Sequence, residues 1–164
     1  MDNKKTQWYI GAPNGVVLCI DRIRDREPSG RLYHSYSLEA EPFVNAEQMV
    51  FRMEHLYDML KFPHPSTNER SFAEPHPQLP NHQERKKIMS DESLLSKHGD
   101  IGTFIVRVQH RQNSSWQGRL TWMEQDKTIY FRSIWEMIKL IESAVDTVST
   151  PEEETAEPSW FPGE

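Results

Sequence analysis

The stretch that decides the fold is residues 16–58, VVLCIDRIRDREPSGRLYHSYSLEAEPFVNAEQMVFRMEHLYD. It aligns without a gap on residues 104–146, FIVRVQHRQNSSWQGRLTWMEQDKTIYFRSIWEMIKLIESAVD, at a constant shift of 88 positions. Seven positions are identical: Gly30-Arg31-Leu32 with Gly118-Arg119-Leu120, Phe43 with Phe131, Met49 with Met137, Glu54 with Glu142 and Asp58 with Asp146. The apolar positions between them also correspond. We therefore expect one small unit to occur twice.

Each copy predicts three strands followed by one helix. In the first copy, alternating apolar residues predict a strand over 16–23, a turn over 25–30, a strand over 31–36 and an extended piece near 42–43. In the second copy the same pattern predicts strands over 104–108, 118–123 and 128–131, with turns over 112–115 and 125–127. The order is the same in both copies.

Capping residues mark the start of each helix. Asn45 with Gln48, and Ser133 with Glu136, are pairs that satisfy the free backbone N–H groups of a helix N-terminus. Apolar residues then recur with helical spacing over 46–60 and 134–148. Two capping pairs at the same shift support the repeat.

These elements predict an α+β fold with one antiparallel sheet. A unit of about 45 residues is marginally stable alone, so the two copies should share one core. We expect two β-β-β-α repeats related by a pseudo-twofold axis, each with its helix packed on the sheet.

The domain boundaries follow composition. Residues 1–61 hold an N-terminal extension and the first repeat, and residues 101–148 hold the second. Between them, residues 62–100 contain five of the eleven prolines and predict either a linker or a loop that wraps the domain, with one short helix over 90–97. Residues 149–164 predict a disordered acidic tail.

Charge and cysteine content narrow the class of protein. Five of the 25 acids lie in the last fourteen residues, which leaves 20 acids against 19 bases elsewhere. A nearly neutral body argues against a generally basic nucleic-acid binder. One cysteine excludes an internal disulfide and fits a reducing compartment. Because no signal peptide or membrane-length apolar run is found, we expect a cytoplasmic protein without membrane contact.

The most unusual string is RVQHRQNSSWQG, residues 107–118. One interpretation is a polar hairpin that binds a ligand or partner through Arg107, Arg111, Asn113, Ser115, Trp116 and the adjacent Arg119. Arginine binds phosphate in a bidentate manner, and tryptophan stacks on bases. The other interpretation is an ordinary hairpin, with Arg107 and Arg111 facing solvent and Trp116 packed across strands.

Part of this string resembles the PilZ family of cyclic-di-GMP receptors. The likeness lies in Arg107-x-x-x-Arg111 and Asn113-x-Ser115-x-x-Gly118. It implies that the arginines hold phosphates and guanines while Asn113 and Ser115 line the other side. The chain departs from the family in placing the two motifs next to each other.

A broader resemblance covers both halves. The pattern RQNSSWQG, then Leu-Thr-Trp, then Phe-Arg-Ser before a helix is similar to a group of small uncharacterised proteins of clostridial (Firmicutes) gut bacteria. The first half, from Gly30-Arg31-Leu32-Tyr33 to Phe62-Pro63, is similar to the same group. This resemblance implies a bacterial, cytoplasmic origin and no particular activity.

The residues do not predict a catalytic site, a metal site or a cofactor. Cys19 lies in a predicted strand with no base indicated, and the histidines of 62–100 have no zinc-site spacing. The carboxylate pairs Glu54 with Asp58 and Glu142 with Asp146 fit a solvated helix face better than acid–base chemistry.

We therefore expect a non-catalytic adaptor or regulatory binding protein that contacts a protein partner. In this hypothesis Trp160 and Phe161 of the tail form a secondary docking element. The alternative is a nucleotide second-messenger or nucleic-acid binding module that uses the 107–119 hairpin.

Overall fold

The computed structural model describes residue 10 and residues 13–67, 71–73 and 86–149. Its strands are β1 (Val16–Arg24), β2 (Glu27–His34), β3 (Glu41–Phe43), β4 (Gly102–His110), β5 (Gln117–Trp122) and β6 (Lys127–Phe131). Its helices are α1 (Ala46–Leu60), α2 (Asp91–Leu95) and α3 (Ile134–Ser149), with one 3₁₀ turn at Met123–Gln125. The six strands form one antiparallel sheet in the order β3-β2-β1-β4-β5-β6. The α+β fold class is thus confirmed.

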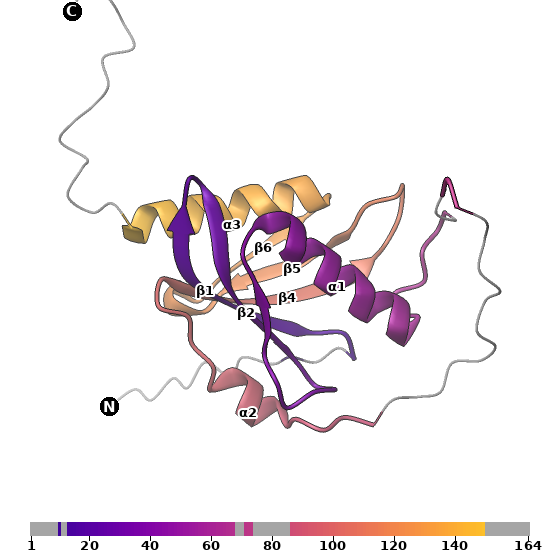
Figure 1. The fold of residues 1–164 in the computed structure, drawn as a ribbon, viewed down its shortest axis with the longest axis horizontal. Coiled ribbons are helices and arrows are strands. Elements are labelled where there is room, and N and C mark those ends of the chain that lie inside the picture. The colour runs from indigo at the N-terminus through magenta and orange to yellow at the C-terminus, as the bar shows by residue number, and fades with distance from the viewer. Residues whose placement is uncertain (1–9, 11–12, 68–70, 74–85, 150–164) are drawn as a thin grey trace, which may run out of the picture.

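Two layers cover the two faces of the sheet (Figure 1). The helices α1 and α3 lie on one face, where Met49, Met53, Met137 and Ile141 pack on residues such as Leu18, Leu32 and Phe104. On the other face, a smaller cluster joins Met89 and Leu94 to Val17, Cys19 and Tyr33. We call these the helix face and the α2 face of the sheet.

The strand registers of the two halves differ by the same 88 positions as the sequences. Leu18 lies opposite Leu32 in the first half, and Val106 lies opposite Leu120 in the second. At the centre of the sheet, Val17 of β1 lies opposite Ile105 of β4, which is its own counterpart in the sequence alignment. Descent of the two halves from one duplicated unit stays a prediction.

Both helices begin as the sequence predicts. The Asn45 side chain accepts a hydrogen bond from the Gln48 N–H at 2.8 Å, and the Ser133 hydroxyl accepts one from the Glu136 N–H at 3.0 Å. Each cap satisfies a backbone donor that the first helical turn leaves without a partner.

The predicted turn over 25–30 is wrong. The reversal is confined to Asp25 and Arg26, which have positive φ angles of 51° and 64°, and Pro28 to Gly30 already belong to β2. The registers explain why glycine is needed in that strand. A Cβ at Gly30 would lie 1.8 Å from the Cys19 carbonyl oxygen, and one at Gly118 would lie 2.1 Å from that of Arg107. Both glycines therefore serve close strand contact and not a turn.

Candidate binding surface

The 107–119 hairpin divides the predicted binding residues between the two faces of the sheet. Its turn lies at Asn113 and Ser114, whose φ angles are 54° and 55°. A bulge between Val108 and His110 inserts one extra residue into β4. Because side chains alternate along a strand, the bulge places Arg107 on the α2 face and turns Arg111 toward the helix face.

Arg111 is buried against α1 and the segment that follows it. Its Nε donates to the Pro63 carbonyl at 2.6 Å, and one terminal nitrogen donates to the Asp58 carboxylate at 2.6 Å. The other terminal nitrogen donates to the Tyr57 carbonyl at 3.4 Å. Only 4% of Arg111 is exposed, so these contacts hold the hairpin to the first half. The sequence predicts Asp58 on a solvated helix face, but its carboxylate accepts a hydrogen bond from the buried Arg111.

Trp116 is buried at the same junction. Its ring meets that of Tyr57 edge to face, with the ring centroids 5.3 Å apart. Burial raises the pKa of the Tyr57 hydroxyl far above its ordinary value. Trp116 is 1% exposed, which leaves no face of its ring for an external base.

A cavity of about 190 Å³ lies beside this junction. Its lining comprises Glu54, Pro65, Thr67, Arg111, Ser114, Ser115 and Trp116. The Ser115 hydroxyl accepts the Ile134 N–H at 3.0 Å, and the Asn113 N–H donates to the Ser66 hydroxyl at 3.3 Å. The predicted polar residues of the turn thus make contacts within the molecule.

The other two predicted arginines meet on the α2 face. Arg107 of β4 lies directly opposite Arg119 of β5, and Arg119 lies directly opposite Tyr130 of β6. The Arg119 guanidinium carbon lies 4.8 Å from the centre of the Tyr130 ring, and 60% of Tyr130 is exposed. We call Arg107, Arg119 and Tyr130 the arginine row.

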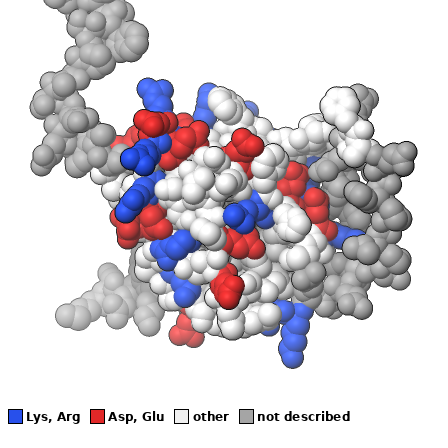
Figure 2. All heavy atoms as spheres, viewed as in Figure 1, with Lys and Arg blue, Asp and Glu red and all other residues white. Residues whose placement is uncertain are grey.

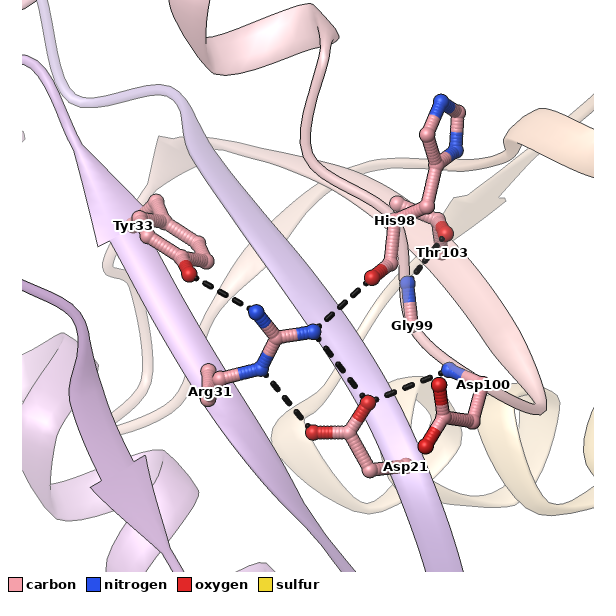
Figure 3. A network of polar contacts seen from close by, with 7 residues as sticks. All are labelled: Asp21, Arg31, Tyr33, His98, Gly99, Asp100 and Thr103. Carbon is pink, nitrogen blue, oxygen red and sulfur yellow. Dashed lines mark hydrogen bonds and ion pairs between the residues drawn. The ribbon is translucent and has the colours of Figure 1, made fainter.

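Residues 98–100 cover the first half of the α2 face. They are held there by Arg31, the counterpart of Arg119, and by its partner Asp21. Arg31 donates to both oxygens of Asp21, at 3.0 and 3.2 Å (Figure 3). It also donates to the His98 carbonyl at 2.8 Å and to the Tyr33 hydroxyl at 2.8 Å. Asp21 in turn accepts the Asp100 N–H at 3.1 Å. This network fixes residues 98–100 over β1 and β2.

No segment among the described residues covers the arginine row in the same way. Residues 86–100 pass under β1 and β2, and α2 contributes Leu94 to the cluster with Val17 and Cys19 (Figure 1). Sequence reasoning missed the Arg31–Asp21 pair because the shared Gly-Arg-Leu motif suggested a common role in the fold. The sequence feature that could have indicated this pair is Asp21, because its counterpart in the second half is the neutral Gln109.

Catalytic chemistry has little support in the part of the chain that the structure describes. Burial raises the pKa of the Cys19 thiol to about 11, so the thiolate needed for attack is scarce at neutral pH. Within the described residues, no three side chains of the His, Cys, Asp or Glu type come together as metal ligands. Trp160 and Phe161, the predicted docking residues of the tail, lie outside the described residues.

Comparison with protein-family models, curated proteins and solved structures gives no match for this chain. Among the helices of the described residues, none combines the length and the apolar character that a membrane crossing requires. Acidic and basic side chains alternate over the surface in Figure 2, and that face shows no large area of one sign.

Proposed function

We propose that this protein is a non-catalytic adaptor or regulatory binding protein that holds an acidic segment of a protein partner on the arginine row. The observation that carries the proposal is the position of Arg119 over the exposed ring of Tyr130, on the half of the α2 face that no described segment covers. A carboxylate of the partner can pair with the Arg119 guanidinium there.

The geometry of Arg119 suits such a ligand. Its guanidinium lies over the Tyr130 ring, a contact that limits side-chain freedom before a partner binds. A guanidinium held in one orientation can donate two parallel hydrogen bonds to a carboxylate. The exposed Tyr130 ring adds apolar contact area next to the charge.

A protein partner fits the charge distribution better than a nucleic acid does. Nucleic-acid binding draws its affinity from many phosphate contacts and a surplus of basic residues, whereas this chain carries 25 acids and 19 bases. The nucleotide alternative also relied on Arg111 and Trp116, whose contacts lie inside the molecule. Arg119 and the exposed Tyr130 lie on the α2 face, where they suit a short acidic segment.

Site-specific photo-crosslinking tests the proposal. A benzoyl-phenylalanine replaces Tyr130 in one variant and the exposed Phe51 of α1 in a control variant, and both are irradiated in the cells that produce the protein. We expect one protein adduct of defined mass from position 130 and none from position 51. Arg119→Gln should lower the yield about tenfold, because a charge-assisted hydrogen bond is lost, while the melting temperature stays unchanged.

Two results would overturn this function. One is the absence of a protein adduct at position 130. The other is an adduct at position 130 that consists of nucleic acid, together with a thermal shift by cyclic-di-GMP or a single-stranded oligonucleotide that Arg119→Gln removes. In that case the second-messenger or nucleic-acid alternative replaces the adaptor.

A further inference from the structure

The two edges of the sheet differ in how well they resist an added strand. β3 is three residues long and contains Pro42, which has no N–H to donate. β6 has five residues without proline, and Lys127 to Tyr130 are all exposed. Among the described strands β6 pairs with β5 alone, so none of them occupies its outer backbone groups. The β6 edge is therefore the one suited to strand addition.

An apolar groove of about 300 Å³ runs between this end of the sheet and α3. Its lining comprises Phe104, Leu120, Trp122, Lys127, Ile129, Leu140, Ser143, Ala144 and Thr147. Lys127 is its single charged residue. The indole N–H of Trp122 is buried and has no acceptor among the described residues. The groove thus offers an apolar floor, one buried donor and a positive rim.

The corresponding place in the first half has a different character. Leu56 of α1 stands where α3 has Ala144, so the side chain that fills the space there is larger. Glu41 stands at the position of Ile129, and Arg52 at the position of Leu140. The hollow on that side is accordingly lined by Glu41, Gln48, Phe51, Arg52 and His55. At the matching place in the first half, the described residues therefore do not repeat the apolar lining of the groove.

The side chains of β6 alternate between the groove and the arginine row. Ile129 lines the groove on the helix face, and 50% of it is exposed. Tyr130, the next residue, contacts Arg119 on the α2 face. A strand added beside β6 must alternate in the same way, since neighbouring strands share the pleat of the sheet.

We propose that β6 accepts an extended segment of the protein partner as a seventh strand, in which apolar residues that enter the groove alternate with acidic residues that face Arg119. This inference rests on the proposed function and names the chemistry of its partner. Main-chain hydrogen bonds to β6 supply affinity, and the alternating side chains supply specificity. On the α2 face Arg119 complements the acidic residues, while on the helix face Ile129 and Leu140 receive the apolar ones.

A peptide with this alternation is the probe. Fluorescein-labelled Glu-Leu-Glu-Val-Glu-Leu-Glu is titrated with the full-length protein and followed by fluorescence anisotropy. The control peptide Glu-Glu-Glu-Glu-Leu-Val-Leu has the same composition in blocks. A third peptide repeats the alternating sequence with its backbone nitrogens methylated, so that it cannot donate to β6. We expect the two controls to bind at least about tenfold more weakly than the alternating peptide.

Variants of the protein locate the site. Ile129→Lys places a charge at the groove and should weaken the alternating peptide about tenfold or more. Arg119→Gln should also weaken binding of the alternating peptide, because it removes the guanidinium that faces the acidic residues on the α2 face. Phe51→Lys is the matched control, since Phe51 is 59% exposed on α1, and it should change nothing. Equal binding of the alternating and block peptides, or no effect of Ile129→Lys, would overturn strand addition.

The two proposals fail in distinguishable ways. If the crosslink at position 130 depends on Arg119 while the alternating peptide has no advantage, the arginine row stands and strand addition falls. If Ile129→Lys removes peptide binding while Arg119→Gln leaves it intact, the arginine row falls as the recognition element. A concentration-dependent dimer that Ile129→Lys abolishes would replace the partner segment by a second copy of this chain.

Discussion

The two β-β-β-α halves of this molecule share a backbone plan and differ in what they hold on the α2 face. The bulges lie between Ile20 and Arg22 in one half and between Val108 and His110 in the other. In the first half, Arg31 fixes residues 98–100 over the strands. In the second half, Arg119 lies on the exposed Tyr130. Identical residues at matching positions thus take different roles because their neighbours differ.

The largest expected difference between the halves concerns how each hairpin packs on the opposite helix. Trp116 of the second hairpin meets Tyr57 of α1, whereas its counterpart Pro28 lines a hollow together with Val145 of α3. Trp116→Ala should lower the free energy of unfolding by about 4 kcal/mol, since it removes a fully buried ring and leaves a cavity. Pro28→Ala should cost about 1–2 kcal/mol, because it deletes about two buried methylene groups. Urea denaturation of both variants measures the difference.

Equal losses from the two substitutions would contradict this packing argument. The m-value serves as the control, since a changed m-value would indicate an altered unfolded state instead of a lost contact.

The extent to which the sequence predicts the fold depends on whether the signals are local. The capping pairs and the apolar stripes predict α1 and α3 closely, because both depend on residues within a few positions of one another. The first hairpin turn is mispredicted, because Pro28-Ser29-Gly30 resembles a turn while the true reversal uses Asp25 and Arg26 with positive φ. No composition rule identifies those two residues.

The candidate site is less predictable because it depends on one bulge and on contacts between distant segments. Without the bulge near Gln109, Arg107 and Arg111 would share a face, as the polar string suggests. With it, Arg111 pairs with Asp58, 53 positions away in the sequence. The covering of β1 and β2 by residues 98–100 depends on Asp21, 79 positions from Asp100. Residue type alone predicted neither pairing.

A smaller effect is expected where the covering segment is held. Asp21→Ala removes the acceptor for Arg31 and for the Asp100 N–H, and should cost about 1–2 kcal/mol of stability because both contacts are partly exposed. Gln109→Ala, at the matching exposed position, should stay within about 0.5 kcal/mol. Hydrogen exchange should show faster exchange of the amides of residues 98–103 in Asp21→Ala only.

Unchanged exchange in residues 98–103 would mean that other contacts hold the segment to the sheet, such as the hydrogen bond from the Ile101 N–H to the Ile20 carbonyl and the burial of Met89 and Leu94. In that event the difference between Arg31 and Arg119 would not explain why one half of the α2 face is covered.

The smallest expected difference is in the pH dependence of the two helix caps. The Gln48 side chain accepts the Val44 N–H at 3.0 Å, and the Glu136 side chain accepts the Arg132 N–H at 3.1 Å. Glu136 also accepts from the Arg132 guanidinium at 2.9 Å, and that hydrogen bond holds the pKa of Glu136 below its ordinary value. A carboxyl whose pKa is lower in the folded state stabilises the protein above its unfolded pKa of about 4.3. The stabilisation is lost as the pH falls through the folded pKa.

Glu136→Gln keeps the acceptor for the backbone N–H and removes the charge. Its melting temperature should therefore lie below that of the wild type at pH 7 and approach it as the pH falls through the folded pKa of Glu136. Gln48→Glu is the matched variant in α1. Val44 stands there at the position of Arg132, so the new carboxylate has no guanidinium at that position and interacts with the helix N-terminus. The difference in melting temperature between Gln48→Glu and the wild type should therefore change less with pH than the difference between the wild type and Glu136→Gln. Parallel melting curves for the wild type and Glu136→Gln from pH 7 to about pH 3 would show that Arg132 adds nothing to the cap, and the two helix starts would then be equivalent in energy as well as in geometry.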